Sequence, residues 1–440
     1  MTPEKTEKLG RAGRALAKIF ADKTGGQLSF RLWTGELVSA PSLDGKPPLE
    51  VRIGSAAALR QMMLKPGIES VAMLYAAGEF DFGDVHPMAL INRVDHTRLV
   101  KAFGWAERLR IMKAALPILT GGGKLADPLA FEGQQGRQPG LDRDDKSLIH
   151  FHYDLSNRFY ELFLDPEMVY SCAYFERDGM SLDEAQTAKL DLICRKLRLA
   201  PGLKLFDTGC GWGSLICHAA QHYGVQAHGV TLAKEQLDYT NAKIARLGLQ
   251  DSVKVELRDY RSVTEPEAYD RIAQIEMFEH LGLDNHDAHF RHVNRLLKPR
   301  GLYLHQASTR RASPNLAGFR KKSVYQQIAT RYIFPGGELD YIGLTVTNLE
   351  RMGFEVHDVE NMREHFQKTC EAWSNRLWDN RAAAASEVGM ARTRMWVAYL
   401  SATVMAFNRL NLNVFQTLAS KRRLGPSGLP LHRRWITNAA

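Results

Sequence analysis

The fold is decided by one stretch of the chain, Leu205-Phe206-Asp207-Thr208-Gly209-Cys210-Gly211-Trp212-Gly213-Ser214. Residues 204–206 predict a short buried strand, and residues 214–220 predict the first turns of a helix. Three glycines, Gly209, Gly211 and Gly213, lie in the loop between them. A strand, a glycine loop and a helix in this order bring a small ligand against backbone amides at a helix N-terminus.

The chemistry around the loop narrows the ligand. The spacing is Gly-x-Gly-x-Gly and not Gly-x-Gly-x-x-Gly, which disfavours a nicotinamide dinucleotide. Asp207 directly precedes the loop, and a carboxylate there suits a ligand with a cationic end, such as the sulfonium and amino group of S-adenosylmethionine. Taken alone, the motif is equally consistent with an ordinary glycine-rich turn, so the surrounding chain has to decide.

Composition limits the class of protein. The chain has 440 residues, enough for two or three domains. Its five cysteines include no Cys-x-x-Cys pair, which favours a reducing, cytoplasmic compartment over a zinc or disulfide framework. The start carries no apolar signal core, and the longest apolar-rich run, 395–407, is too short to span a bilayer. The net charge of +9 fits an anionic partner, either nucleic acid or a membrane surface.

The first third predicts a small mixed region. Residues 6–21 form an amphipathic pattern with basic residues opposite the apolar ones, typical either of a helix at an anionic lipid interface or of an ordinary surface helix. Short strands follow within 28–53, then short helices, then a helical segment over 100–120. Residues 121–147 are rich in glycine and polar residues and predict a flexible linker.

Beyond the linker, strands and helices alternate. The predicted strands are 204–206, 225–230, 253–257, 272–275, 302–305, 354–359 and 414–418, and the predicted helices are 181–199, 234–247, 290–297 and 382–410. This alternation predicts an α/β fold with a doubly wound, mostly parallel sheet of the Rossmann-like methyltransferase kind (class I). Ligands of such sheets lie at the carboxyl ends of the strands, which makes residues 231–232, 259–260, 276–280 and 305–308 candidates for the site.

No metal centre is predicted. His150 and His152 flank Phe151, but no third ligand stands at a supporting spacing.

Many ordered segments resemble the cyclopropane-fatty-acid synthase family of S-adenosylmethionine-dependent enzymes. Besides the glycine loop, the matching segments are HYDLSN (152–157), YSCAY (170–174), GVTLAKEQ (229–236), DYR (259–261), MFEH (277–280), YIFPGG (332–337), KT (368–369) and AW (372–373). The resemblance implies a methyltransferase domain over 148–421. It also implies, more weakly, a lipid-facing accessory α+β domain over 1–120. Residues 422–440 predict a flexible basic tail.

The resemblance also implies an activity. Members transfer the methyl of S-adenosylmethionine to the double bond of an acyl chain in a membrane phospholipid and close a cyclopropane ring. This implies peripheral association with an anionic membrane surface on its cytoplasmic side and no nucleic-acid partner. The oligomeric state stays open, a homodimer included. By the same resemblance the cofactor-binding residues are Tyr170, Ser171, Asp207, Gly209, Gly211, Gly213, Thr231, Gln236, Asp259 and Tyr260.

The resemblance implies catalytic residues as well. In the family a bicarbonate ion serves as the base beside a Cys, a Glu, a His and a Tyr, and Cys172, Glu279 and His305 match the first three. Phe366 stands where the family has Tyr, so the ring is kept and the hydroxyl is lost. By itself, Cys172 is better explained as a small buried hydrophobic residue. The residues expected in the substrate pocket are Phe278, Tyr332, Phe334, Phe366 and Trp373.

Three other functions compete with ring closure. With an altered base, the same methyl transfer would give a methyl-branched unsaturated chain. A non-catalytic lipid-binding protein on the same fold is disfavoured by the intact glycine loop, Glu279 and His305. Nucleic-acid methylation is suggested only by the basic charge, and the sequence contains no Asn/Asp-Pro-Pro-Tyr motif.

Overall fold

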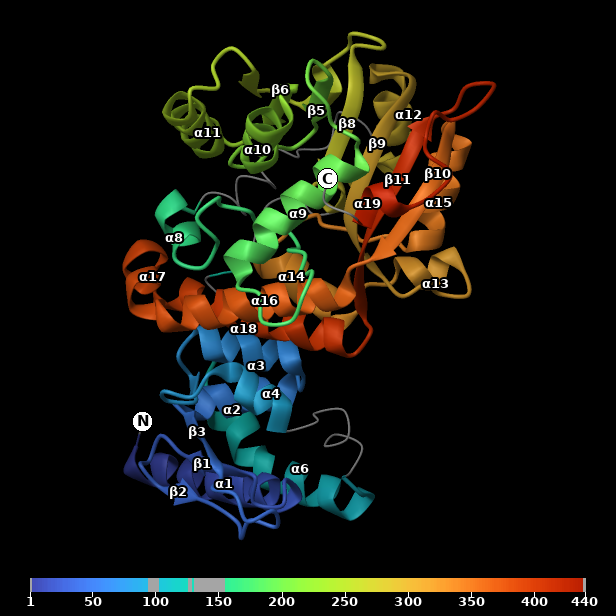
Figure 1. Cartoon of the computed structure of the whole chain (residues 1–440). Coiled ribbons are helices and arrows are strands. Elements are labelled where there is room, and N and C mark those ends of the chain that lie inside the picture. Colours follow the sequence, from blue (N-terminus) through green and yellow to red (C-terminus); the bar gives the residue numbers. More distant parts are fainter. Residues whose placement is uncertain (1, 94–102, 126–128, 130–154, 438–440) are drawn as a thin grey trace. The chain divides into compact units, whose positions relative to one another are not determined.

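The computed structural model describes residues 2–93, 103–125, 129 and 155–437 (Figure 1). Most of the predicted linker over 121–147, together with His150 and His152, lies outside these residues. The chain forms two compact units. The N-terminal unit comprises Met1–Ala130, Ser323–Ile328 and Leu377–Met405, and the sheet unit comprises Phe131–Lys322, Ala329–Arg376 and Ala406–Ala440.

The N-terminal unit combines a four-stranded sheet with helices. Its strands have the order β2-β1-β3-β4 and are β1 (Leu28–Arg31), β2 (Leu37–Val38), β3 (Leu49–Ile53) and β4 (Phe80–Asp81). Its helices include α1 (Pro3–Lys23), α2 (Ala56–Leu64), α3 (Ile68–Ala76), α4 (Pro87–Arg93) and α6 (Trp105–Gly121). The helix predicted over 6–21 is confirmed. Of the helix predicted over 100–120, residues 100–102 lie outside the described residues, and the described part begins only at Trp105. The apolar face of α1, with Leu9 and Leu16, is buried and packs on α6.

The sheet unit contains the predicted doubly wound sheet. Its seven strands have the order β10-β11-β9-β8-β5-β6-β7. They are β5 (Lys204–Asp207), β6 (Gln226–Thr231), β7 (Val253–Leu257), β8 (Tyr269–Ile275), β9 (Leu297–Arg310), β10 (Phe354–Asn361) and β11 (Leu412–Lys421). The strands β5 to β9 are parallel, whereas β11 pairs antiparallel with both β9 and β10. The predicted fold class is therefore confirmed.

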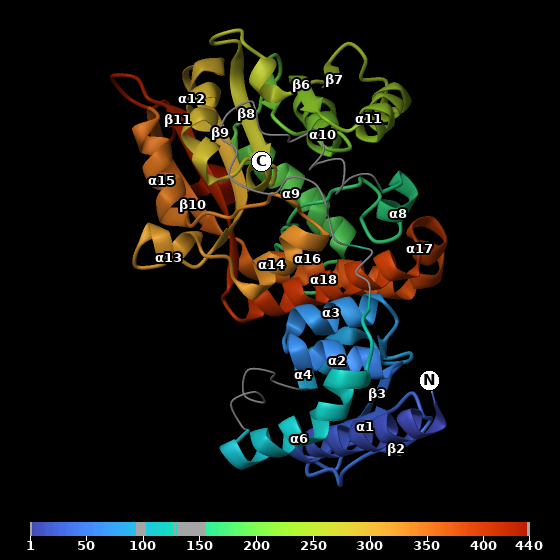
Figure 2. The same ribbon diagram turned by 180° about the vertical axis from the view of Figure 1, so that it is seen from behind.

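Helices cover both faces of this sheet. The principal ones are α9 (Leu182–Lys196), α10 (Ser214–Tyr223), α11 (Lys234–Leu247), α12 (His286–Leu296), α15 (Ile342–Arg351) and α16 (Arg363–Asp379). Because strand side chains alternate, Leu205 packs in a core with α9 and α10, and Phe206 packs in a second core with α12 and α15. Figures 1 and 2 show α12 and α15 together on one side of the sheet and α10 and α11 on the other.

Shorter segments complete the unit: α8 (Asn157–Glu161), α13 (Leu316–Arg320), α14 (Val324–Tyr332, partly in the N-terminal unit), α19 (Arg434–Thr437) and the 3₁₀ turns η2 (Tyr260–Ser262), η3 (Phe278–His280) and η4 (Leu283–Asn285). The helix predicted over 382–410, most of which belongs to the N-terminal unit, is present as α17 (Arg381–Val388) and α18 (Met390–Asn408). It is interrupted at Gly389, whose φ is 82°.

Two neighbouring elements, α12 and β9, begin earlier than the sequence predicts. Helix α12 begins at His286, four residues before the predicted start, and β9 begins directly after it, five residues before the predicted strand. Pro299 therefore lies inside β9. The ladder with β11 starts only at Leu302, and the pairing with β8 shifts register in this stretch. Because Pro299 precedes the ladder with β11, its missing N–H removes no bond from that ladder.

The segment after β11 makes specific contacts up to Thr437. The backbone N–H of Arg422 donates to the carbonyl oxygen of Gly353 at 2.9 Å, Arg433 pairs with Asp358, and Trp435 packs against the core beside α9 and α10. In the part of the chain that the structure describes, no helix is long and apolar enough to cross a membrane.

Candidate active site

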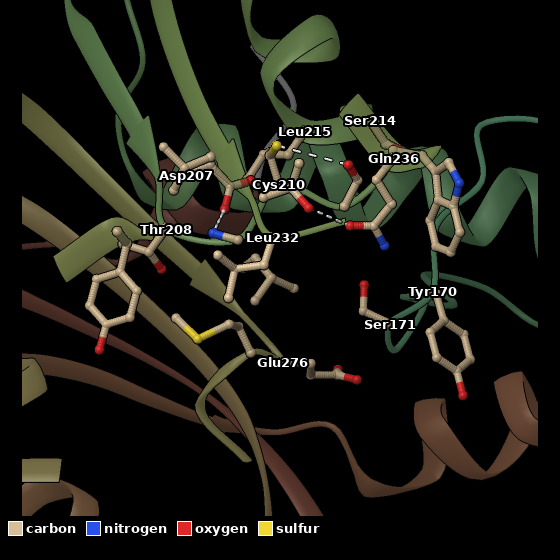
Figure 3. Close-up of a pocket in the computed structure, with 18 of the residues that line it drawn as sticks. Tyr170, Ser171, Asp207, Thr208, Cys210, Ser214, Leu215, Leu232, Gln236 and Glu276 are labelled. Carbon is tan, nitrogen blue, oxygen red and sulfur yellow. Dashed lines mark hydrogen bonds between the residues drawn. The ribbon is translucent and has the colours of Figure 1, made fainter. Parts of the chain in front are cut away.

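A pocket lies at the carboxyl ends of β5, β6, β7 and β8, where the topology predicts a ligand (Figure 3). All of the predicted cofactor-binding residues line it, with the exception of Gly213. That residue lies directly between two lining residues, Trp212 and Ser214, at the start of α10. Figure 3 shows Asp207 and Cys210 at one side of the pocket and Ser171 and Glu276 at another.

The glycine loop needs its glycines for two reasons. Gly211 and Gly213 have φ values of 53° and 79°, in the left-handed region that side chains disfavour. A Cβ on Gly213 would lie 2.4 Å from Thr240 Cγ2, whereas a Cβ on Gly211 would meet nothing within 4 Å. A Cβ on Gly209 would lie 3.0 Å from Met277 Cγ. Gly213 is therefore needed for close packing against Thr240, whereas Gly211, which lines the pocket, has free space where a side chain would begin.

Asp207 is a buried carboxylate at the end of β5. It accepts the backbone N–H of Gly209 at 3.2 Å. Burial raises the pKa of Asp207 to about 6, opposed by the Gly209 hydrogen bond and by the charge of Lys189. A cationic ligand beside Asp207 would favour its ionised form and would itself be held there.

Lys189, on α9, is a pocket residue that the sequence analysis missed. Its side chain is buried, and its Nζ donates to Ser171 Oγ at 2.7 Å. The carbonyl oxygen of Ser171 accepts the side-chain amide of Gln186 at 2.9 Å. Burial lowers the pKa of Lys189, opposed chiefly by Glu276. Its position inside the helix pattern of 181–199 gave no signal, because a Lys in such a helix is ordinarily exposed.

The remaining cofactor-binding candidates form local hydrogen bonds. Thr231 Oγ1 donates to Gln236 Oε1 at 2.7 Å and accepts the N–H of Ala233 at 3.1 Å. Asp259 forms an ion pair with Arg261 at 2.6 Å and also accepts its backbone N–H at 2.8 Å. The hydroxyl of Tyr260 lies 3.1 Å from His289 Nδ1. Asp259 and Tyr260 therefore sit at the pocket in fixed orientations.

Cys172 is completely buried beside the pocket and not in its wall. Its Sγ donates to the carbonyl oxygen of Ala173 at 3.2 Å, and burial raises its pKa. Its backbone N–H donates to Glu276 Oε1 at 3.0 Å. The thiol is thus directed at backbone, and the main chain of Cys172 is what meets the acidic group.

Glu279 lies in the turn after β8. Its Oε1 accepts the backbone N–H of Ser308 at 2.5 Å, while its Oε2 is buried without a hydrogen-bond partner among the described residues. Burial, and then the nearby charge of Glu276, raise the pKa of Glu279 to about 8. Glu279 therefore holds a proton at neutral pH when Glu276 is ionised.

His305 lies on the opposite face of the sheet from Gln306. It packs against Phe278 and Phe290 with ring centroids 4.6 and 5.4 Å apart, and its Nδ1 lies 3.2 Å from the Tyr303 hydroxyl. Burial, and then the charge of His286, lower the pKa of His305 to about 3. Phe278 belongs to the same aromatic cluster beside α12, and neither His305 nor Phe278 lines the pocket.

Aromatic rings surround the far side of Tyr170. The ring of Tyr170 lies 5.2 Å from that of Trp373, which in turn contacts Phe366 at 5.9 Å. Phe366 also contacts Phe407 at 5.0 Å. Tyr170 lines the pocket and contacts Trp373, and Trp373 in turn contacts Phe366. Tyr332 is buried elsewhere in the unit, and Phe334 lies 5.5 Å from His280.

Glu276 is the second residue that the sequence analysis did not single out. It lines the pocket and directly follows β8. Its Oε1 accepts from Gln306 Nε2 at 2.6 Å and from the N–H of Cys172. Residues 276–280 were predicted to lie at the site, but the resemblance implied a role for Glu279 alone, and no feature of the sequence pointed to Glu276.

Comparisons with known proteins agree with this architecture. The sequence model of the mycolic acid cyclopropane synthetase family matches residues 142–417 of this chain. A probable fatty acid methyltransferase of Mycobacterium tuberculosis is 33% identical over 386 residues, covering 84% of this chain and 86% of that protein. A probable fatty acid methyltransferase of Pseudomonas putida is 37% identical over 279 residues, covering 63% and 70% respectively.

A solved structure is similar as well. The crystal structure of mycolic acid cyclopropane synthase CmaA1, complexed with SAH and CTAB, is 35% identical with a TM-score of 0.59. The match covers 63% of this chain and 98% of the CmaA1 chain.

Proposed function

Because the chain belongs to the mycolic acid cyclopropane synthetase family, we propose that it methylates the double bond of an unsaturated acyl chain in membrane phospholipid and closes a cyclopropane ring. Its cofactor is S-adenosylmethionine, and its reaction is methyl transfer to a fatty acyl chain. The phospholipid form of the substrate and the cyclopropane product are the proposed parts.

The residues of the pocket fit the cofactor. The glycine loop offers backbone amides at the start of α10, and Asp207 offers a negative charge to a cationic amino-acid end. We assign Thr231 and Gln236 to the amino-acid and ribose portions, Asp259 and Tyr260 to the adenine, and Tyr170 and Ser171 to the cover of the site. When bound, the cofactor supplies a methyl electrophile strong enough for an alkene.

One observation supports ring closure above all: buried carboxylates adjoin the cofactor pocket. Methyl transfer to an alkene leaves a carbocation, which needs a dry site, nearby aromatic faces and a group that accepts a proton. Tyr170 and Trp373 supply aromatic faces, and Glu276 and Glu279 supply acidic groups. A base at this place favours loss of a proton from the new methyl, which closes the ring.

The bicarbonate ion that the resemblance implies does not fit these residues as a group. It would need Cys172, Glu279 and His305 to converge. Instead, the thiol of Cys172 donates to a backbone carbonyl, and His305 packs with aromatic rings on the α12 side of the sheet. Phe366 supplies no hydroxyl. The proposed reaction therefore does not use bicarbonate.

The experiment that tests the function is acyl-chain analysis after expression in a bacterial host lacking its own synthase. We expect phospholipid acyl chains that gain one CH₂ and take up no hydrogen under conditions that saturate alkenes. A CH₂ gain that still takes up hydrogen would contradict ring closure and support the methyl-branched product, which Phe366 favours by its missing hydroxyl. S-adenosylhomocysteine (SAH) is what remains of the cofactor after methyl transfer. If calorimetry shows that the protein does not bind SAH, the result would favour a non-catalytic lipid-binding protein.

We also propose that the N-terminal unit docks on an anionic membrane surface through α6. Four apolar side chains at helical spacing on α6 are exposed: Trp105 (82%), Leu109 (45%), Met112 (67%) and Leu116 (61%). Arg108, Arg110 and Lys113 lie on the same helix. An exposed apolar stripe with cations beside it suits insertion at a lipid interface. The apolar face of α1 is already buried, so α1 is the poorer candidate.

A further inference from the structure

Glu276 has an unusual backbone. It stands directly after β8 with a φ of 54°, in the left-handed region where a residue with a side chain costs about 1–2 kcal/mol relative to the right-handed one. A glycine would adopt this conformation without that cost. Strain of this kind persists where the surrounding structure enforces it, and it is concentrated at functional sites. The side chain of Glu276 is thus a candidate for a role that a glycine could not fill.

The hydrogen bonds of Glu276 fix one of its oxygens and leave the other toward the pocket. Oε1 accepts both the N–H of Cys172 and the amide of Gln306. Gln306 is itself oriented by Gln416, whose Nε2 donates to Gln306 Oε1 at 2.7 Å. Oε2 makes no hydrogen bond with the described residues, and Figure 3 shows the carboxylate at the open space beside Ser171.

The charges around Glu276 favour one proton acceptor there. Four titratable groups interact electrostatically with Glu276: Lys189 from α9, Glu279 from the following turn, Cys172 from the segment after α8, and Cys370 from α16. Burial raises the pKa of Glu276, opposed by its two hydrogen-bond donors and Lys189. The two carboxyl groups repel each other, so one of them retains a proton while the other is ionised.

We propose that Glu276 is the group that accepts the proton during ring closure, in place of a bound bicarbonate. This inference rests on the proposed function. The alkene π pair forms a bond to the methyl carbon as the C–S bond breaks and its electrons leave with sulfur. A C–H bond of the new methyl then breaks, its electron pair forms the third ring bond, and the proton goes to Glu276 Oε2. Water later takes that proton.

The test is Glu276→Gln, because the amide oxygen can still accept from Cys172 and Gln306. We expect ring closure to fall about 10²–10⁴-fold, the usual contribution of a general base, with SAH affinity in calorimetry within about tenfold of wild type. Glu256→Gln, on β7 and outside the pocket, serves as the matched control and should leave the products unchanged. Ring closure by Glu276→Gln within a few-fold of wild type would overturn the inference.

A second variant decides if Glu276→Gln does not bind SAH. Glu276→Asp keeps the acid and withdraws it by one methylene, so ring closure should persist at a reduced rate. The pH at which that rate rises should move away from the wild-type value, because a different acid now loses the proton. A purely structural Glu276 would leave that pH profile unaltered, and an unchanged profile would overturn the inference. Wild-type protein that adds no carbon to any acyl chain would overturn the proposed function as well.

Discussion

At the scale of single residues, Gly213 and Gly211 allow two requirements of the loop to be tested separately, namely a positive φ and space for close packing. Both have positive φ, so an alanine at either costs roughly 1–2 kcal/mol of backbone strain. Only at Gly213 would the new Cβ meet another side chain, at 2.4 Å from Thr240 Cγ2. We expect Gly213→Ala to lower the free energy of unfolding clearly more than Gly211→Ala, as measured by urea denaturation. Equal losses would contradict the close packing of Gly213 on α11.

The raised pKa of Glu279 predicts how the stability of the protein depends on pH. Its pKa is raised from 4.5 to about 8 in the folded protein. Between these values the folded state binds a proton that the unfolded state has lost, so this contribution to stability is present at low pH and is lost as pH rises toward 8. We expect wild type to lose stability from about pH 5 to about pH 8 more steeply than Glu279→Gln in urea denaturation. Parallel curves would refute the raised pKa.

The residues of the site show where sequence reasoning stopped. The predicted cofactor-binding residues come from segments that resemble the family, several of them at strand ends. The structure places these residues around the pocket or, for Gly213, at its edge. His305 and Gln306 are adjacent in a strand buried on both faces, so hydrophobic alternation does not tell which of them points toward the ligand. The structure turns Gln306 toward Glu276 and His305 toward α12. Only the register of β9 reveals this.

At the scale of elements, strong local patterns gave the best predictions. Helix α11 and strand β7 have the predicted bounds, and the helix predicted over 181–199 is present as α9. Helix α9 begins with a capping box, in which Ser181 Oγ accepts the N–H of Glu184 at 3.2 Å. Strand β4 was not predicted, because its two residues are strand only through their pairing with β3. Elements that depend on partners distant in the sequence carry no local signal.

Helix α6 carries the prediction for membrane docking. Leu116→Glu places a charge in the exposed apolar stripe and should weaken binding to anionic vesicles about tenfold in a sedimentation assay, because a buried apolar contact is replaced by a repelled charge. Leu43→Glu is the matched control, since Leu43 is 87% exposed in the same unit but outside α6. Equal losses in the two variants would contradict docking through α6.

At the scale of the whole molecule, the N-terminal unit includes a segment that comes late in the sequence, residues 377–405. The sequence placed residues 377–405 in a catalytic domain over 148–421, whereas their contacts group them with the first 130 residues. Arg394 pairs with Asp81 at 2.9 Å, and the ring of Trp378 lies 5.1 Å from that of His86. Such pairings join positions some 300 residues apart, and nothing in the local sequence of α17 or α18 announces them.

The net charge of +9 gives a prediction for the whole protein acting on the proposed phospholipid substrate. Each cation near an anionic surface contributes about 1 kcal/mol, and raising ionic strength from about 0.1 M to about 1 M shortens the screening length from about 10 Å to about 3 Å. We therefore expect the KM for phospholipid in anionic vesicles to rise at least tenfold with added salt, while kcat and SAH affinity change little. Neutral vesicles are the control. If KM on neutral vesicles rose equally, the salt would act on the pocket or the fold, and electrostatic docking of the N-terminal unit would be wrong.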